Sequence, residues 1–118
     1  MARQVHTVID TVGPYPVGQP GAGTATLAWV AADTANKDEV ALDYPVMVFA
    51  WNTDGANPYT VTFEIVAGSG IQPITGYSLA AGEIAGFEFR PHNWKQANGC
   101  LFFEANNAAV KFAVLKKG

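Results

Sequence analysis

The side chains that could do chemistry in this chain are few and widely spread. A single cysteine, Cys100, follows Gly99 at the start of an apolar run, and the two histidines, His6 and His92, belong to no recognisable catalytic motif. A thiol becomes a nucleophile when a nearby base or cation lowers its pKa, and no motif here offers Cys100 such a partner. We therefore interpret Cys100 as a small buried thiol, and a lone cysteine cannot form an intramolecular disulfide.

Carboxylates gather in one acidic segment, at Asp33, Asp38, Glu39 and Asp43. Four carboxylates within eleven residues could indicate calcium binding. Their spacing does not match the alternate ligand positions of an EF-hand loop, and the glycine needed for its sharp turn is absent. A solvated acidic loop is the preferred interpretation.

Three further carboxylates, Glu64, Glu88 and Glu104, alternate outward on separate expected strands and could converge on one sheet face. Enzymatic hydrolysis or transfer needs a nucleophile with a base, a pair of carboxylates or a metal cluster, and the sequence supplies none at usable spacing. The sequence thus predicts a protein that is not an enzyme and has no metal or other cofactor.

The three tryptophans, Trp29, Trp51 and Trp94, indicate a second kind of chemistry. With nearby Asn and Asp they could form a stacking platform for a carbohydrate. Aromatic residues in apolar runs are usually core, however, and Trp51 lies in the most apolar run of the chain. Trp94, in a polar turn, is the only good exposed candidate, and a carbohydrate-binding β-sandwich module is kept as the alternative function.

Short strands must position these side chains. Runs rich in Val, Phe, Tyr, Ile and Thr are bounded by Gly, Asn, Asp and Pro, a pattern typical of an all-β, single-domain antiparallel sandwich or barrel. The runs cover residues 46–51, 59–66, 86–90, 101–105 and 110–115.

Alternation within these runs predicts which side chains face the core. Period-two spacing assigns Phe63, Phe87, Phe103 and Phe112 inward. The turn at 52–58 contains Asp-Gly and Asn-Pro, so the runs 46–51 and 59–66 are expected to pair antiparallel as a hairpin. A further turn at 81–82 is expected to join two more short strands.

The N-terminal part has a different composition. Residues 3–12 fit a first strand, and residues 13–23 hold three prolines and four glycines, which prevent regular pairing. This segment is either an arm that reaches a neighbour or a plain surface loop. We divide the chain into an N-terminal strand and Pro/Gly-rich arm at 1–23 and a sandwich at 24–118, and we expect the sandwich to fold without residues 1–23. Residues 24–30 could begin a strand, and 31–42 fit a short helical turn or a polar loop.

Composition limits the partners. The chain has 118 residues, a formal charge of −3 and a pI near 5.1, which argues against nucleic-acid binding because that needs clustered Lys and Arg. Only 14% of residues are charged, against about 25% in a typical soluble domain. The shortage indicates either a surface partly covered by partner subunits, hence a homo-oligomer, or simply an Ala-rich surface.

No apolar run of membrane-spanning length or signal-peptide type occurs, so we expect no membrane partner and a chain made and used without export.

Over about its last 75 residues the chain resembles the small structural proteins of tailed-phage virions, of the head-decoration or minor-capsid type. The resemblance lies in the order of several elements, none of them specific by itself. They are a strand ending in Asn52, the NPYTVTF strand, the LAAGE turn around Gly82, an aromatic run closing at Pro91, an Asn/Trp turn with Gln96, Asn98-Gly99 before LFF, and a closing VKFAVLKK.

The resemblance implies a jelly-roll-like or tulip-like β domain on the outer surface of a capsid. It implies the major capsid protein as partner, a homotrimer as the favoured assembly, and the virion as location after synthesis in the host cytoplasm. With the composition of the arm, it makes a short set of residues candidates for capsid or subunit contact. They are Pro14, Tyr15, Pro16, Pro20 and Trp94.

Overall fold

The computed structural model describes residues 2–10 and 26–116, and in them nearly all the regular secondary structure is β-strand. The elements are β1 (Gln4–His6), β2 (Val8–Ile9), β3 (Val30–Ala31), β4 (Asp38–Ala41), β5 (Val46–Asn52), β6 (Tyr59–Phe63), β7 (Ile74–Leu79), β8 (Ile84–Phe89), α1 (Pro91–Trp94), β9 (Cys100–Ala105) and β10 (Val110–Lys116).

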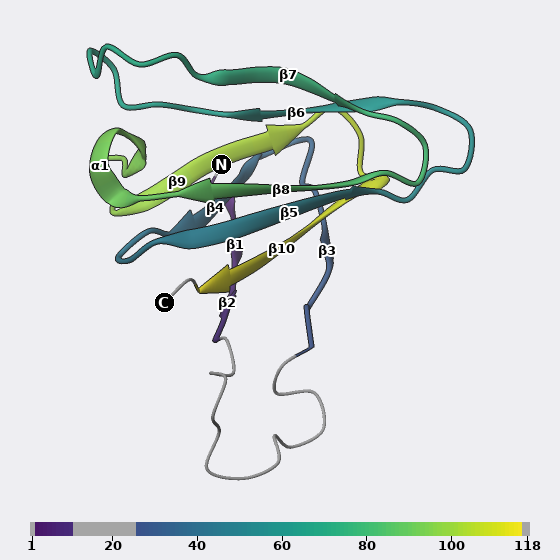
Figure 1. Cartoon of the computed structure of the whole chain (residues 1–118), viewed down its shortest axis with the longest axis horizontal. Coiled ribbons are helices and arrows are strands. Elements are labelled where there is room, and N and C mark those ends of the chain that lie inside the picture. The colour runs from purple at the N-terminus through teal and green to yellow at the C-terminus, as the bar shows by residue number, and fades with distance from the viewer. Residues whose placement is uncertain (1, 11–25, 117–118) are drawn as a thin grey trace, which may run out of the picture.

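The strands form two sheets that pack face to face (Figure 1). Sheet I has the order β1-β4-β9-β6-β7, and sheet II has the order β2-β10-β5-β8, with β3 also pairing with β10. The predicted all-β sandwich is therefore confirmed. The sheets are mixed rather than purely antiparallel, because β1 pairs parallel with β4 and β2 pairs parallel with β10.

Aromatic rings from both sheets fill the core between them. Phe103 of sheet I meets Phe112 of sheet II with ring centroids 4.7 Å apart, and Phe63 meets Phe89 at 4.7 Å. The inward assignment of Phe63, Phe103 and Phe112 is confirmed, since all three are fully buried. Phe87 also faces the core, but it is only half-buried at the rim, and Phe89 holds the fully buried position next to it.

The predicted hairpin between the runs 46–51 and 59–66 is wrong. β5 belongs to sheet II and β6 to sheet I, so the turn between them crosses the sandwich. The buried side chain of Asn52 fixes this crossing by donating to the carbonyls of Asn57 at 2.8 Å and Leu79 at 3.0 Å. The turn at 81–82 likewise joins strands of different sheets, β7 and β8. Alternation along a strand cannot predict which sheet the strand joins, because a hairpin and a crossing bury the same apolar side chains.

The N-terminal strand is not separate from the core. β1 lies at the edge of sheet I and β2 at the edge of sheet II, and the chain passes from one sheet to the other at Thr7. Residues 4–9 are thus built into both layers, which corrects the expectation that the strand before the Pro/Gly segment belongs to an arm outside the sandwich.

The acidic segment also differs from expectation. A turn at 34–36 is followed by a strand, β4, where the sequence indicated only a helical turn or a loop. Asp38 begins this strand and is completely buried, so the interpretation of all four carboxylates as solvated is wrong for this residue.

Candidate functional site

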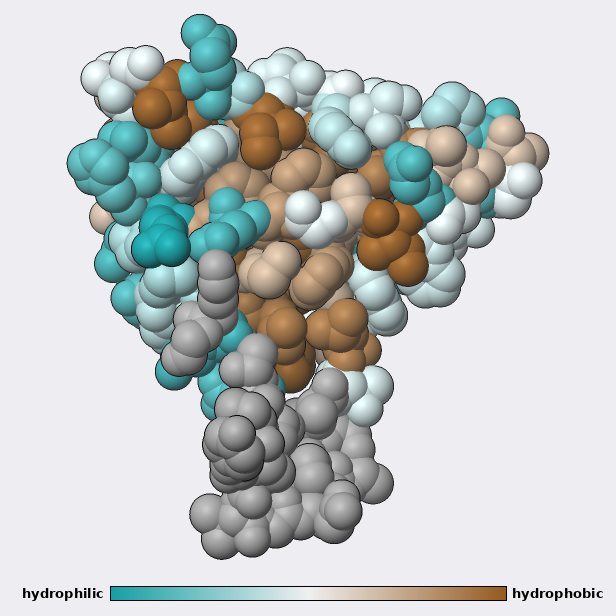
Figure 2. Space-filling model, in the orientation of Figure 1, coloured by the Kyte–Doolittle hydropathy of each residue, from teal (hydrophilic) through white to brown (hydrophobic). Residues whose placement is uncertain are grey.

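The outer face of sheet II carries large apolar side chains. Strand register places Leu115 beside Met47, Ala113 beside Phe49, and Lys111 beside Trp51. On the other side of β5, Gly86 lies beside Phe49 and Ile84 beside Trp51. Figure 2 shows apolar residues gathered over β5, β8 and β10 in this view. We call this surface the apolar face and define it by Trp29, Met47, Phe49, Trp51, Ile84 and Leu115.

The local sequence explains how one strand supplies both the core and this face. In β5 the inner residues Val46, Val48 and Ala50 are fully buried, and the residues between them are also apolar. The sequence pattern is that of a strand covered on both faces. In the described part of the chain, the outer row of β5 stays partly exposed, and Ile84 beside it has 54% of its surface exposed.

Gly86 allows the centre of the apolar face to pack flat. A Cβ atom at this position would lie 3.1 Å from Cε1 of Phe49, closer than carbon atoms pack without displacement. The Phe49 ring therefore covers the bare backbone of β8, an aromatic-on-glycine contact that joins the two strands.

The three tryptophans do not form one platform. Trp29 and Trp51 meet at 5.4 Å with their planes 63° apart, an edge contact that offers a sugar no shared flat surface. Trp94 packs edge-on against Phe89 at 4.8 Å. Phe89 pairs with Val46, at the opposite end of β5 from Trp51, so Trp94 lies roughly 17 Å from the other two along the sheet.

A cleft lies at this second end of the sheet. Glu88, Arg90, His92 and Trp94 line it. The Arg90 guanidinium contacts the Glu88 carboxylate at 3.4 Å in an exposed ion pair. Trp94, predicted as an exposed contact residue, is thus half-buried: one edge meets the core and the rest borders the cleft.

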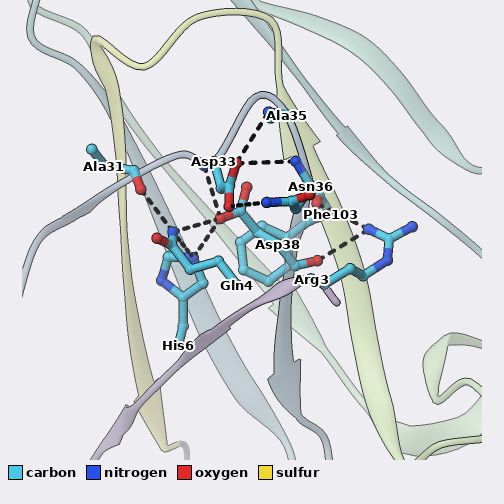
Figure 3. A network of polar contacts seen from close by, with 9 residues as sticks. All are labelled: Arg3, Gln4, His6, Ala31, Asp33, Ala35, Asn36, Asp38 and Phe103. Carbon is cyan, nitrogen blue, oxygen red and sulfur yellow. Dashed lines mark hydrogen bonds and ion pairs between the residues drawn. The ribbon is translucent and has the colours of Figure 1, made fainter. Parts of the chain in front are cut away.

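The main polar cluster of the interior surrounds Asp38 (Figure 3). Asp38 Oδ1 lies 2.8 Å from His6 Nε2 and accepts a hydrogen bond from Gln4 Nε2 at 2.8 Å. The backbone N–H of Asp33 donates to the same oxygen at 3.2 Å. The network ties β1 to β4 and to the turn before β4.

An Asp–His pair supplies two of the three members of a catalytic triad, so its surroundings decide its role. The side chains of His6 and Asp38 are 2% and 0% exposed, and the His6 ring packs against Phe103 and Phe112. Among the described residues, the hydrogen bonds of His6 reach only Gln4 and Asp38, so no hydroxyl or thiol is in place to be activated. The pair holds the N-terminal strand in the sandwich.

Arg3 reinforces this attachment. Its Nη2 contacts Glu64 Oε2 at 2.8 Å, its Nη1 donates to the Asp38 carbonyl at 3.2 Å, and its guanidinium lies 4.0 Å from the centre of the Phe102 ring. Asp38 Oδ2 is buried without a hydrogen-bond partner in the described structure. Such an atom costs stability, which makes the three donors on Oδ1 more important.

The remaining carboxylates do not combine into a site. Glu64 pairs with Arg3, Glu104 pairs with Lys37 at 3.4 Å, and Glu88 lies on the other sheet. In the turn before β4, Asn36 donates to Asp33 through its backbone N–H and its side-chain amide, and these bonds lower the pKa of Asp33. Within the described ranges, no group of three or more His, Cys, Asp or Glu residues could hold a metal ion.

Cys100 is half-buried at the start of β9. Burial raises the pKa of its thiol to about 11, and a hydrogen bond from Sγ to Glu39 Oε2 at 3.3 Å acts in the same direction. A thiol with this pKa is protonated at neutral pH and is a poor nucleophile.

Four of the five predicted contact residues, Pro14, Tyr15, Pro16 and Pro20, lie outside the described residues. The apolar face is the feature that sequence reasoning missed as a site. Its signal was present in the run 46–51, where both parities are apolar, but that run was assigned to a strand with two covered faces.

Comparison with known proteins adds no relative. A scan against protein-family models, a search of curated proteins and a search of solved structures each found no match. Among the described residues, the chain has no helix long and apolar enough to cross a membrane.

Proposed function

We propose that this protein is a non-enzymatic structural subunit of a tailed-phage virion that binds the outer surface of the capsid and stabilises it. The major capsid protein is its partner and the assembled virion its location. The resemblance of the last 75 residues to head-decoration proteins supplies this setting, and the sandwich is a suitable scaffold for such a role.

The observation that carries the proposal is the apolar face. Large side chains such as Met47, Phe49 and Trp51 stand partly exposed on a regular sheet, beside the more exposed Ile84. A contiguous apolar patch on a small protein usually marks a site of protein contact. The interior Asp–His pair has no access to solvent, which favours a binding role over an enzymatic one.

The test is co-sedimentation with capsids of the phage that encodes the chain. Trp51→Glu places a carboxylate in the apolar face, where docking would bury it without a partner, and we expect at least a tenfold weaker association. Ser78→Glu is the matched control, since Ser78 is exposed on β7 of the opposite sheet. Equal binding by both variants would contradict the apolar face as the docking surface.

The alternative, a carbohydrate-binding module, keeps one supporting observation, the cleft in which Trp94 lies beside polar side chains. Titration with oligosaccharides, followed by tryptophan fluorescence, separates the two functions. A saturable change that Trp94→Phe removes would favour the carbohydrate module.

A further inference from the structure

Sheet II lacks a strand opposite β7. Phe63 of β6 meets Phe87 and Phe89 of β8 at 4.8 and 4.7 Å, so β6 lies across the sandwich from β8. The next strand of sheet I is β7, whereas β8 is the last strand on its side of sheet II. Figure 1 shows β6 and β7 on the side of β8 that is away from β5. Around Tyr77 the inner side of β7 therefore faces a space that no described strand occupies, whereas Leu79 at the end of β7 is fully buried.

The exposure of Tyr77 fits this description. Tyr77 pairs with the fully buried Val61, so its side chain is on the inner face of sheet I, yet 46% of its surface is exposed. Its ring meets the half-buried Phe87 edge-on at 5.3 Å. Tyr77 and Phe87 form an aromatic wall along the open space.

The backbone of β8 presents hydrogen-bonding groups to the same space. The N–H of Asn52 donates to the carbonyl of Glu83, which directs Glu83 and every second residue after it toward β5. In an antiparallel ladder the intervening residues point the other way. The N–H and C=O groups of Ile84 and Gly86 are thus directed toward the open edge.

This edge lacks two of the usual protections, a bulge and a proline. β8 pairs with β5 over six consecutive residues without a register shift, and it contains no proline. The other long edge, β7, is irregular: its register shifts between Val61 and Phe63, Gly76 has φ +63°, and the Gly76 N–H is already bonded to Thr62 Oγ1. A long regular edge beside exposed apolar side chains is a template for strand addition.

We propose that an extended segment of the capsid protein adds to β8 as a further strand of sheet II and fills the space beneath β7. We call this place the β8 slot, defined by Tyr77, Ile84, Gly86 and Phe87. The inference rests on the proposed function and identifies a second contact beside the apolar face. The segment needs apolar residues at alternate positions, to meet Tyr77 and Phe87, and free N–H groups on the side facing β8.

The shape of the slot selects this occupant. β7 projects beyond β8, so a second folded copy that paired through its own β8 would bring its own projecting β7 into the same space. An isolated extended segment avoids that collision. Glu83, exposed before β8, favours a lysine or arginine at the end of the segment that reaches it.

The experiment measures hydrogen–deuterium exchange of the full chain, free and bound to capsids. We expect the Ile84 and Gly86 amides to exchange rapidly in the free protein and at least tenfold more slowly on capsids. Ile84→Pro removes the Ile84 donor at an edge position that tolerates proline, and we expect it to weaken capsid binding at least tenfold. Ile84→Val keeps the donor and should bind as the unaltered chain does.

If a thermal melt shows that Ile84→Pro does not fold, Tyr77→Glu provides a second variant. It alters the aromatic wall without changing the β8 backbone. Capsid binding without protection of the two amides, or with equal affinity for Ile84→Pro and Ile84→Val, would overturn the β8 slot and leave the proposed function intact. Protection that rises with concentration in the free protein would assign the slot to a second copy instead. Absence of any capsid binding would overturn the proposed function and this inference together.

Discussion

At the scale of single residues, Asp38 shows how two aspartates of one short segment can have opposite roles. Asp38 is buried and accepts three hydrogen bonds on one oxygen, whereas the Asp43 side chain is 66% exposed and forms a surface ion pair with Lys95. Composition could not separate them. What distinguishes Asp38 is its position opposite β1, which depends on a strand 34 residues earlier in the chain.

We expect Asp38→Ala to lower the free energy of unfolding by about 3–5 kcal/mol, because it leaves the buried His6 Nε2 without its hydrogen-bond partner. Asp43→Ala is the matched control and should change it by less than about 0.5 kcal/mol, as exposed pairs contribute little. Urea denaturation measures both. Similar midpoints for the two variants would mean that the interior network contributes nothing to stability.

The Cys100 thiol gives a pH-dependent prediction. Because burial and Glu39 raise its pKa to about 11, the thiolate forms in the folded protein only at more alkaline pH than in the unfolded chain. We expect alkylation by iodoacetamide to be slow at pH 8 and to rise toward pH 11 in the folded state. In urea, the rise in alkylation rate should come at lower pH. Glu39→Gln should lower the pKa of the Cys100 thiol in the folded protein. Rapid labelling of the folded protein at pH 8 would contradict this.

At the scale of the elements, period-two alternation was a reliable guide and strand pairing was not. Alternation placed Phe63, Phe103 and Phe112 correctly, since facing the core is a property of each strand alone. Which sheet a strand joins is decided by all the strands together. The loops after β5 and β7 are compatible with either a hairpin or a crossing, and the buried amide of Asn52 that fixes one crossing has no signal in the local sequence.

Phe63 and Phe87 provide a matched pair of substitutions. Phe63→Ala opens a cavity at the centre of the aromatic core and should cost about 3–5 kcal/mol. Phe87 borders the β8 slot and is half-buried, so Phe87→Ala should cost roughly half as much or less. Equal losses in chemical denaturation would show that the slot is closed in solution.

The N-terminal strand is expected to be essential, in contrast to the sequence-based expectation of a detachable arm. Removing residues 1–9 takes away β1, β2, the partner of Asp38 and the Arg3–Glu64 ion pair. We expect the free energy of unfolding to fall by about 3 kcal/mol or more. A thermal melt measures it, and an unchanged transition would show that the strand is dispensable.

At the scale of the whole molecule, the shortage of charge indicated either a surface covered by partners or an Ala-rich surface, and the structure shows where an uncovered apolar surface lies. The class of fold followed from the number and spacing of apolar runs, because only packed sheets bury such runs. The sequence shows that both faces of the run 46–51 are apolar, but it does not show that the outer face stays uncovered, and it carries no signal of the β8 slot. The uncovered face and the slot depend on which strand ends each sheet, a property that appears only when all the strands are in place.

The parallel pairing of β2 with β10 also has a consequence for synthesis. Val8 lies beside Val114, so β2 finds its neighbouring strand in sheet II only after all the strands between them have been made. Sheet II cannot close around the core until β10 has been made, and contacts of such long sequence separation form slowly. During that interval β5 has only β8 beside it in sheet II, and the edge of β5 that β10 later occupies is open. Nascent chains stalled before residue 110 should therefore be digested rapidly by protease, and resistance should appear only after β10 has left the ribosomal tunnel.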